Sequence, residues 1–106
     1  MTAIEQLQFP KPVRLRDKKA LQIYHRTHPK CEVIGCRFRS TGPHHILSRS
    51  LGGPDAPRNL IALCDLHHTG SQGPHQMGHR SWFRAFESKL SDEAREKIRT
   101  ALRLED

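Results

Sequence analysis

Four metal-ligating side chains at two short spacings constrain the fold of this chain more than any other feature. Cys31 and Cys36 are separated by four residues, and after 27 further residues Cys64 and His67 are separated by two. Two such pairs form the halves of a zinc ribbon, in which thiolate and imidazole groups surround the ion as a tetrahedron. The pattern predicts a structural zinc site, because four protein ligands leave no coordination position open for catalysis.

The composition favours a metal-stabilised domain over a disulfide scaffold. The chain has 106 residues, 35% of them hydrophobic, and domains with so modest a core often need a metal or a disulfide. Its three cysteines are an odd number, and all three belong to the predicted zinc site. The alternative, that the cysteines are only small core residues, leaves the ligand spacing of both pairs unexplained.

The net charge is +7, and the positive charge is concentrated towards the N-terminus. Residues 1–30 contain seven Lys and Arg against two acidic residues, whereas residues 91–106 contain four against five. A polyanion such as nucleic acid would bind the basic half, although charge alone does not distinguish that half from an ordinary solvated surface. With no signal peptide and no apolar run of the roughly 20 residues that a membrane helix needs, we expect a reduced, cytoplasmic protein without a membrane partner.

The hydrophobic periodicity predicts one domain over residues 1–106, built from four segments. Residues 1–16 contain the two prolines of FPKPV and are expected to form an extended basic arm, and residues 17–30 a helix capped by Asp17. Residues 31–78 are expected to form a zinc-stabilised core, with a strand over 44–47, a turn at 52–54 and an apolar segment over 59–64. In residues 79–106 two helices are expected, over about 80–90 and from Ser91 onward, with Trp82 and Phe86 as core residues rather than base-stacking ones.

Five histidines besides His67 cluster around the two halves of the predicted zinc site: His44, His45, His68, His75 and His79. His44 and His45 are adjacent on the predicted strand, so their side chains point to opposite faces of it. One ion cannot readily bind both, and we expect the two side chains to have different roles. His25 and His28 lie on the basic first helix, where a surface or phosphate-facing position is expected.

The segment HHILSRSLGGPDAPRNLIALCDLHH, residues 44–68, resembles the signature of HNH endonucleases, in which a histidine, a later asparagine and a final histidine surround a Gly-Gly turn. The corresponding positions are His45, Asn59 and His68. The resemblance covers about residues 31–86 and is to the small zinc-ribbon members of phages and prophages. It implies an α+β fold with a ββα-metal finger, two strands and a helix around one divalent ion that contacts the scissile phosphate.

The resemblance also implies a role for each residue of the motif. His45 is the expected general base, and Asn59 is expected to hold the loop that carries it. The catalytic ion is expected to be bound by His44, His68 and His75, with His79 as the alternative to His75. His44 stands where an Asp usually precedes the base, and His67-His68 stands where a Cys-His pair usually closes the knuckle. Because nitrogen ligands suit Mn, Ni or Zn and oxygen ligands suit Mg, the identity of the ion stays open among these four.

The implied reaction is metal-dependent hydrolysis of DNA phosphodiester bonds. A neutral histidine can accept the proton of the attacking water while the ion stabilises charge on the phosphorane and the leaving oxygen. One site per chain predicts nicking by a monomer or weak dimer. Phosphate contacts are expected from basic residues of the arm and the first helix: Lys11, Arg14, Arg16, Lys18 and Lys19.

Two alternatives of other classes stay open at this point. The first is a noncatalytic zinc-ribbon module that binds nucleic acid, and the second is a structural subunit of phage packaging or repair machinery that retains the motif. Only the endonuclease hypothesis makes His45 essential for cleaving a bond.

Overall fold

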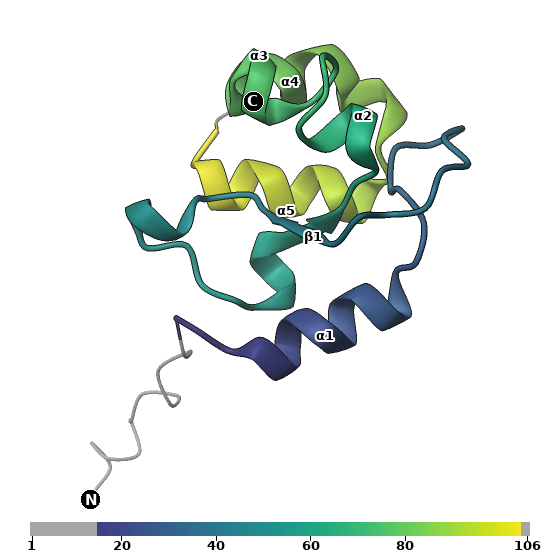
Figure 1. The fold of residues 1–106 in the computed structure, drawn as a ribbon. Coiled ribbons are helices and arrows are strands. Elements are labelled where there is room, and N and C mark those ends of the chain that lie inside the picture. The colour runs from purple at the N-terminus through teal and green to yellow at the C-terminus, as the bar shows by residue number, and fades with distance from the viewer. Residues whose placement is uncertain (1–14, 105–106) are drawn as a thin grey trace, which may run out of the picture.

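In the computed structural model, which describes residues 15–104, an antiparallel two-stranded hairpin is surrounded by helices (Figure 1). The strands are β1, Pro43–His45, and β2, Leu60–Ala62. The helices are α1 (Lys18–Thr27), α2 (Asp65–His68), α3 (Pro74–Met77), α4 (His79–Phe86) and α5 (Asp92–Leu102), with 3-10 turns η2 (Arg49–Leu51), η3 (Pro57–Asn59) and η4 (Glu87–Lys89). The predicted α+β class, with a hairpin between flanking helices, is confirmed for these residues.

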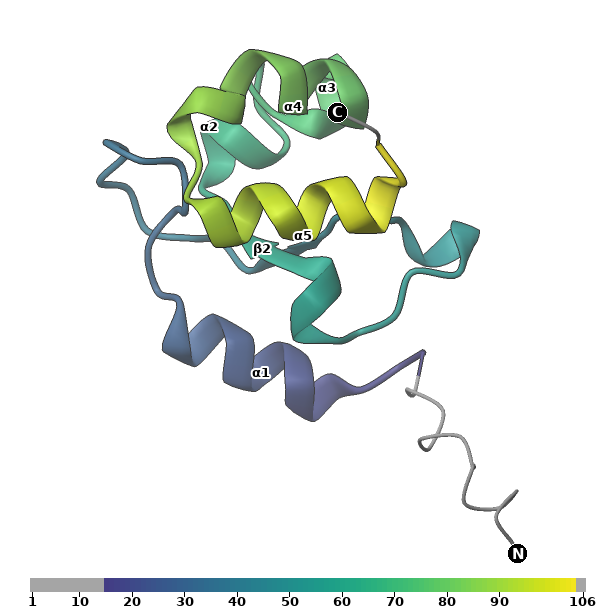
Figure 2. The ribbon, with the colours of Figure 1, turned by 180° about the vertical axis from the view of Figure 1, so that it is seen from behind.

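Strand β2 is buried on both of its faces. Ile61 belongs to the main core with Trp82 and Ile98, whereas Leu60 and Ala62 pack with Tyr24 of α1. The hairpin therefore lies between α1 on one side and the α4–α5 pair on the other, as Figures 1 and 2 show from opposite directions. The register pairs His44 with Ile61, so the side chain of His44 points towards the main core.

Capping and apolar periodicity account for the longer helices. Asp17 caps α1 by accepting a hydrogen bond from the Ala20 N–H (3.1 Å), and Ser91 caps α5 by accepting one from the Ala94 N–H (3.1 Å). Both caps were predicted. Trp82 and Phe86 are buried in the main core, which confirms their assignment to packing.

The structure differs from the expected boundaries in three places. Helix α1 ends at Thr27 rather than at residue 30, because Pro29 follows its C-cap residue His28. Strand β1 ends at His45 rather than at Leu47, because the Leu47 N–H donates to the Asn59 side chain (2.8 Å) instead of continuing the ladder. Helix α4 begins at His79 and ends at Phe86, and the unpredicted helix α3 precedes it. Gly78, with φ of 88°, separates α3 from α4, since a left-handed residue cannot continue an α-helix.

The predicted basic arm falls largely outside residues 15–104. Lys11 and Arg14 are among the residues not described, whereas Arg16, Lys18 and Lys19 are exposed to solvent. Within the described range, none of the helices combines the length and apolar character that crossing a membrane requires.

Candidate metal centres

The four predicted zinc ligands come together in space. The Cys36 and Cys64 sulfurs are 3.7 Å apart, and Nδ1 of His67 lies 3.3 Å from the Cys64 sulfur and 3.6 Å from that of Cys31. A tetrahedral zinc with bonds of about 2.3 Å to sulfur and about 2.1 Å to nitrogen would set these separations at about 3.8 and 3.6 Å. The Cys3His cluster therefore fits a structural zinc ion.

Local backbone structure places each ligand of the Cys3His cluster. Cys64 is the N-cap residue of α2, and the single turn of that helix brings His67 back beside it. On the other half, the Cys36 N–H donates to the Val33 carbonyl (3.0 Å), which folds residues 31–36 into a tight knuckle. Such turns explain why spacings of four and two residues bring the four side chains together.

The thiols of this cluster differ in acidity. Burial raises the pKa of Cys31 to about 12. Burial also acts to raise the pKa of Cys64, but the His67 N–H and the neighbouring thiols stabilise its thiolate and the net shift is downward. The Cys64 thiol therefore ionises more readily than that of Cys31.

A second cluster is formed by His44 of β1, His68 of α2 and His75 of α3. One ring nitrogen of each lies within 4.8 Å of the others, a separation that small side-chain rotations can close around one ion. The ring centroid of His44 is 4.9 Å from that of His68 and 5.1 Å from that of His75. The two clusters meet at α2, where His67 faces the sulfurs and His68 faces the histidines.

Burial keeps His44 neutral and available as a ligand. Its Nε2 is buried and has no hydrogen-bond partner among residues 15–104, which is costly unless another group, such as a metal ion, uses it. Burial, reinforced by the neighbouring imidazoles, lowers the pKa of His44 to about 2, and the pKa of His68 is lowered as well, mainly by burial. Neutral imidazole is the form that binds metals.

His79 lies beside this cluster without joining it. Its ring stacks on His44 with centroids 5.1 Å apart, and its Nε2 is buried without a hydrogen-bond partner in the described part of the chain. The metal-compatible group nevertheless contains His75 rather than His79. His75 therefore stays the predicted third ligand, with His79 as the alternative.

His45 points to the opposite face of β1 and is held there by a buried carboxylate. Its Nε2 donates to Oδ1 of Asp55 (2.7 Å), whose side chain is 1% exposed. Burial opposes ionisation of Asp55, but hydrogen bonds from the Asp17 N–H, His45 and Arg49 outweigh it and lower the pKa of Asp55 to about 2. Because an ionised carboxylate only accepts hydrogen bonds, the proton of neutral His45 is on Nε2 and its Nδ1 carries a lone pair.

Sequence reasoning did not identify Asp55. Its contacts come from Asp17, 38 residues away, from His45, ten residues away, and from Arg49, so no local periodicity marks it. The available signal was an acidic residue directly after the Gly-Gly-Pro turn of the motif, a position from which it could fold back on the histidine.

Asn59 clamps the loop between the strands. Its Oδ1 accepts from the Leu47 N–H (2.8 Å), and its Nδ2 donates to the carbonyls of Leu47 and Pro54 (both 3.0 Å). Gly53 permits this approach, since a Cβ there would lie 1.8 Å from the Leu47 carbonyl oxygen. Asn59 therefore has the geometry of an orienting residue rather than a reacting one.

Replacing Asn59 with alanine should lower the free energy of unfolding by about 2–4 kcal/mol, because three backbone groups of Leu47 and Pro54 lose their partner in a largely buried site. Urea unfolding of the zinc-loaded protein measures this loss. Arg58→Ala is the matched control, since Arg58 is the exposed neighbour on η3. An equal, small effect of both substitutions would contradict the clamp.

No protein-family model, curated protein or solved structure matched this chain. The functional assignment therefore depends on the two clusters and on His45.

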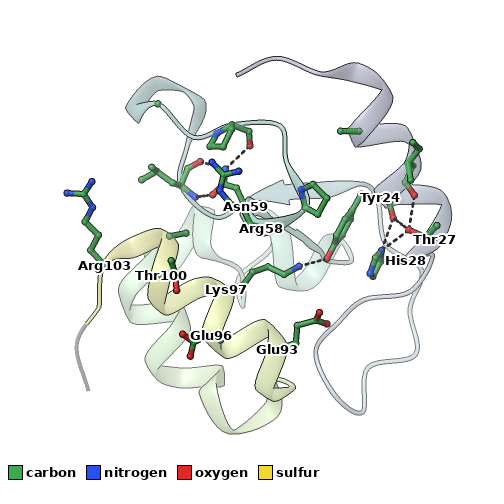
Figure 3. A pocket seen from close by; sticks show the side chains of 17 residues that line it. Tyr24, Thr27, His28, Arg58, Asn59, Glu93, Glu96, Lys97, Thr100 and Arg103 are labelled. Atoms are coloured by element: carbon green, nitrogen blue, oxygen red, sulfur yellow. Dashed lines mark hydrogen bonds between the residues drawn. The ribbon is translucent and has the colours of Figure 1, made fainter. Parts of the chain in front are cut away.

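A large hollow lies away from both clusters. It has a volume of about 1000 Å³ and lies between α1, η3 and α5 (Figure 3). On its wall, Nζ of Lys97 donates to the Tyr24 hydroxyl (3.0 Å) and to the Leu60 carbonyl (2.9 Å), so these polar groups already have partners. This network ties α5 to α1 and to β2.

Proposed function

We propose that this protein is a metal-dependent DNA endonuclease, with His44, His68 and His75 as ligands of the catalytic ion and His45 as the general base. The main observation behind the proposal is that two neighbouring residues of β1 face different groups. His44 faces a cluster that could hold an ion, while His45 faces a carboxylate that fixes its proton on Nε2. Hydrolysis of a phosphodiester needs both a charge-stabilising ion and a proton acceptor, and two adjacent residues of β1 would supply one group for each task.

The order of the elements supports the proposal. His44 and His45 lie on β1, Asn59 immediately precedes β2, and His68 lies on α2. A strand, a second strand and a helix in this order are what the resemblance to HNH endonucleases implies for a ββα-metal finger. The Cys3His cluster would fasten the start of that helix to the preceding knuckle.

In the proposed mechanism each side chain has one task. When bound, a divalent ion would act as a Lewis acid for the charge on the phosphorane and the departing 3′ oxygen. His45 would accept the proton of the attacking water on Nδ1, while Asp55 holds the ring and stabilises the imidazolium that forms. Exposed Arg16, Lys18 and Lys19 would contact phosphates of the DNA. The products would carry 5′-phosphate and 3′-hydroxyl ends.

The decisive experiment is a nicking assay on supercoiled plasmid. Zinc-loaded protein should convert the plasmid to open circles in at least one of Mn, Ni, Mg or added Zn, and His68→Ala should abolish this conversion while retaining one zinc per chain. His25→Ala, an exposed histidine of α1, serves as the control and should nick normally. If wild-type protein binds DNA but leaves the plasmid intact in every ion, the noncatalytic zinc-ribbon alternative replaces the enzyme.

A further inference from the structure

The tip of the zinc knuckle, residues 34–39, exposes large apolar side chains beside positive charge. Ile34 is 60% and Phe38 66% exposed, and Phe38 lies between Arg37 and Arg39, which are both exposed. The roles proposed above use none of these four residues. Exposed aromatic and basic side chains gathered on one loop are typical of a binding surface.

The backbone of the knuckle tip is firmly held. The Cys31 N–H donates to the Phe38 carbonyl (3.0 Å), the Ile34 N–H donates to the Lys89 carbonyl (2.7 Å), and Lys30 and Arg39 form a β-bridge. A zinc ion in the Cys3His cluster would fasten Cys31 and Cys36 from within. Binding a partner here would therefore require little further ordering of the chain, which favours affinity.

The charge around the knuckle tip selects an anionic partner. Residues 33–39 contain no acidic residue, and Lys30 and Lys89 add exposed positive charge at the base of the loop. Glu32, the nearest acid in the sequence, is already bonded to the Tyr24 hydroxyl and the Ala62 N–H. Arg37 and Arg39 form no ion pair within residues 15–104.

An open hollow of about 460 Å³ connects the knuckle tip with the loop between the proposed catalytic ligands. Phe38 and Lys89 line one part of it, and Gln72 lines another. Gln72 belongs to the segment that joins His68 to His75. Both ribbon views place the 34–39 loop beside α2 (Figures 1 and 2). A DNA strand that leaves the histidine cluster could therefore place a nearby nucleotide in this hollow.

We propose that the knuckle tip binds DNA next to the scissile bond, with Phe38 stacking on a base and Arg37 and Arg39 contacting phosphates. DNA presents the flat faces of its bases next to negatively charged phosphates. These two groups match an exposed aromatic ring that is flanked by two arginines. The location relative to the scissile bond rests on the proposed function, whereas DNA binding by the tip does not.

Fluorescence-anisotropy titration tests the proposal separately from cleavage. A labelled DNA duplex with a short single-stranded extension is titrated with zinc-loaded protein carrying His45→Ala, which slows any cutting during the titration. In this background Phe38→Ala should weaken binding roughly tenfold and Phe38→Trp should restore it. Replacing Arg37 and Arg39 together with Gln should reduce the slope of log affinity against log salt by about two.

Matched controls are Leu51→Ala, an equally exposed apolar residue on η2, and Arg84→Gln, an exposed basic residue on α4. If the Phe38 and Leu51 variants bind DNA equally well, the proposal is overturned and the surface belongs to a partner of another class, such as a protein. If Phe38→Ala loses zinc, the double Arg variant decides, and an unchanged salt slope overturns the proposal. If the wild-type protein does not nick DNA, the proposed function fails, but these titrations still test whether the knuckle tip binds DNA.

Discussion

Replacing His45 with alanine is expected to reduce plasmid nicking by about 10²- to 10⁴-fold, the range that removal of a positioned proton acceptor produces. The structure gives a specific reason for so large an effect. Nε2 of His45 donates to Asp55, and the low pKa of Asp55 keeps that carboxylate ionised near neutral pH. The ring is thereby oriented and its free nitrogen is available to water.

The measurement is the rate of open-circle formation under saturating metal, compared with the zinc content and melting temperature of the same preparation. The His45 side chain is 18% exposed, so its truncation leaves only a small void and folding should persist. His25→Ala controls for the loss of an exposed imidazole. Nicking by His45→Ala at the wild-type rate would reject His45 as the base, whatever the role of the ion.

The second large effect is expected on stability. Cys64→Ser should abolish zinc binding and leave the domain unfolded or molten at 25 °C, because the free energy of structural zinc binding, about 10–16 kcal/mol in small zinc domains, rivals the stability of a whole domain. Cys64 is the appropriate residue since it is buried, caps α2, and approaches both Cys36 and His67.

Zinc content per chain and thermal unfolding followed by circular dichroism measure this effect. His68→Ala is the matched control, because it alters a neighbouring residue of α2 while retaining the three sulfurs and the ring nitrogen of the Cys3His cluster. The control should keep its zinc and most of its stability. Wild-type protein that melts at the same temperature before and after complete zinc removal would show that the three thiols only pack in the core.

Features that depend on neighbours in the chain were predictable. The caps Asp17 and Ser91 and the buried face of Trp82 and Phe86 follow from hydrogen bonding and periodicity within one or two turns. The end of β1 was not predictable in this way, because the side chain of Asn59, twelve residues on, takes the Leu47 N–H from the ladder.

By itself, the sequence determined the residues of the Cys3His cluster and the opposite orientations of His44 and His45, because knuckle turns and strand alternation are set by local backbone geometry. Only the tertiary structure brought His75 beside His44 and His68, and Asp55 against His45. It also revealed the exposed Phe38 on the knuckle tip. These features arise where segments distant in sequence are packed together, and no spacing along the chain records that packing.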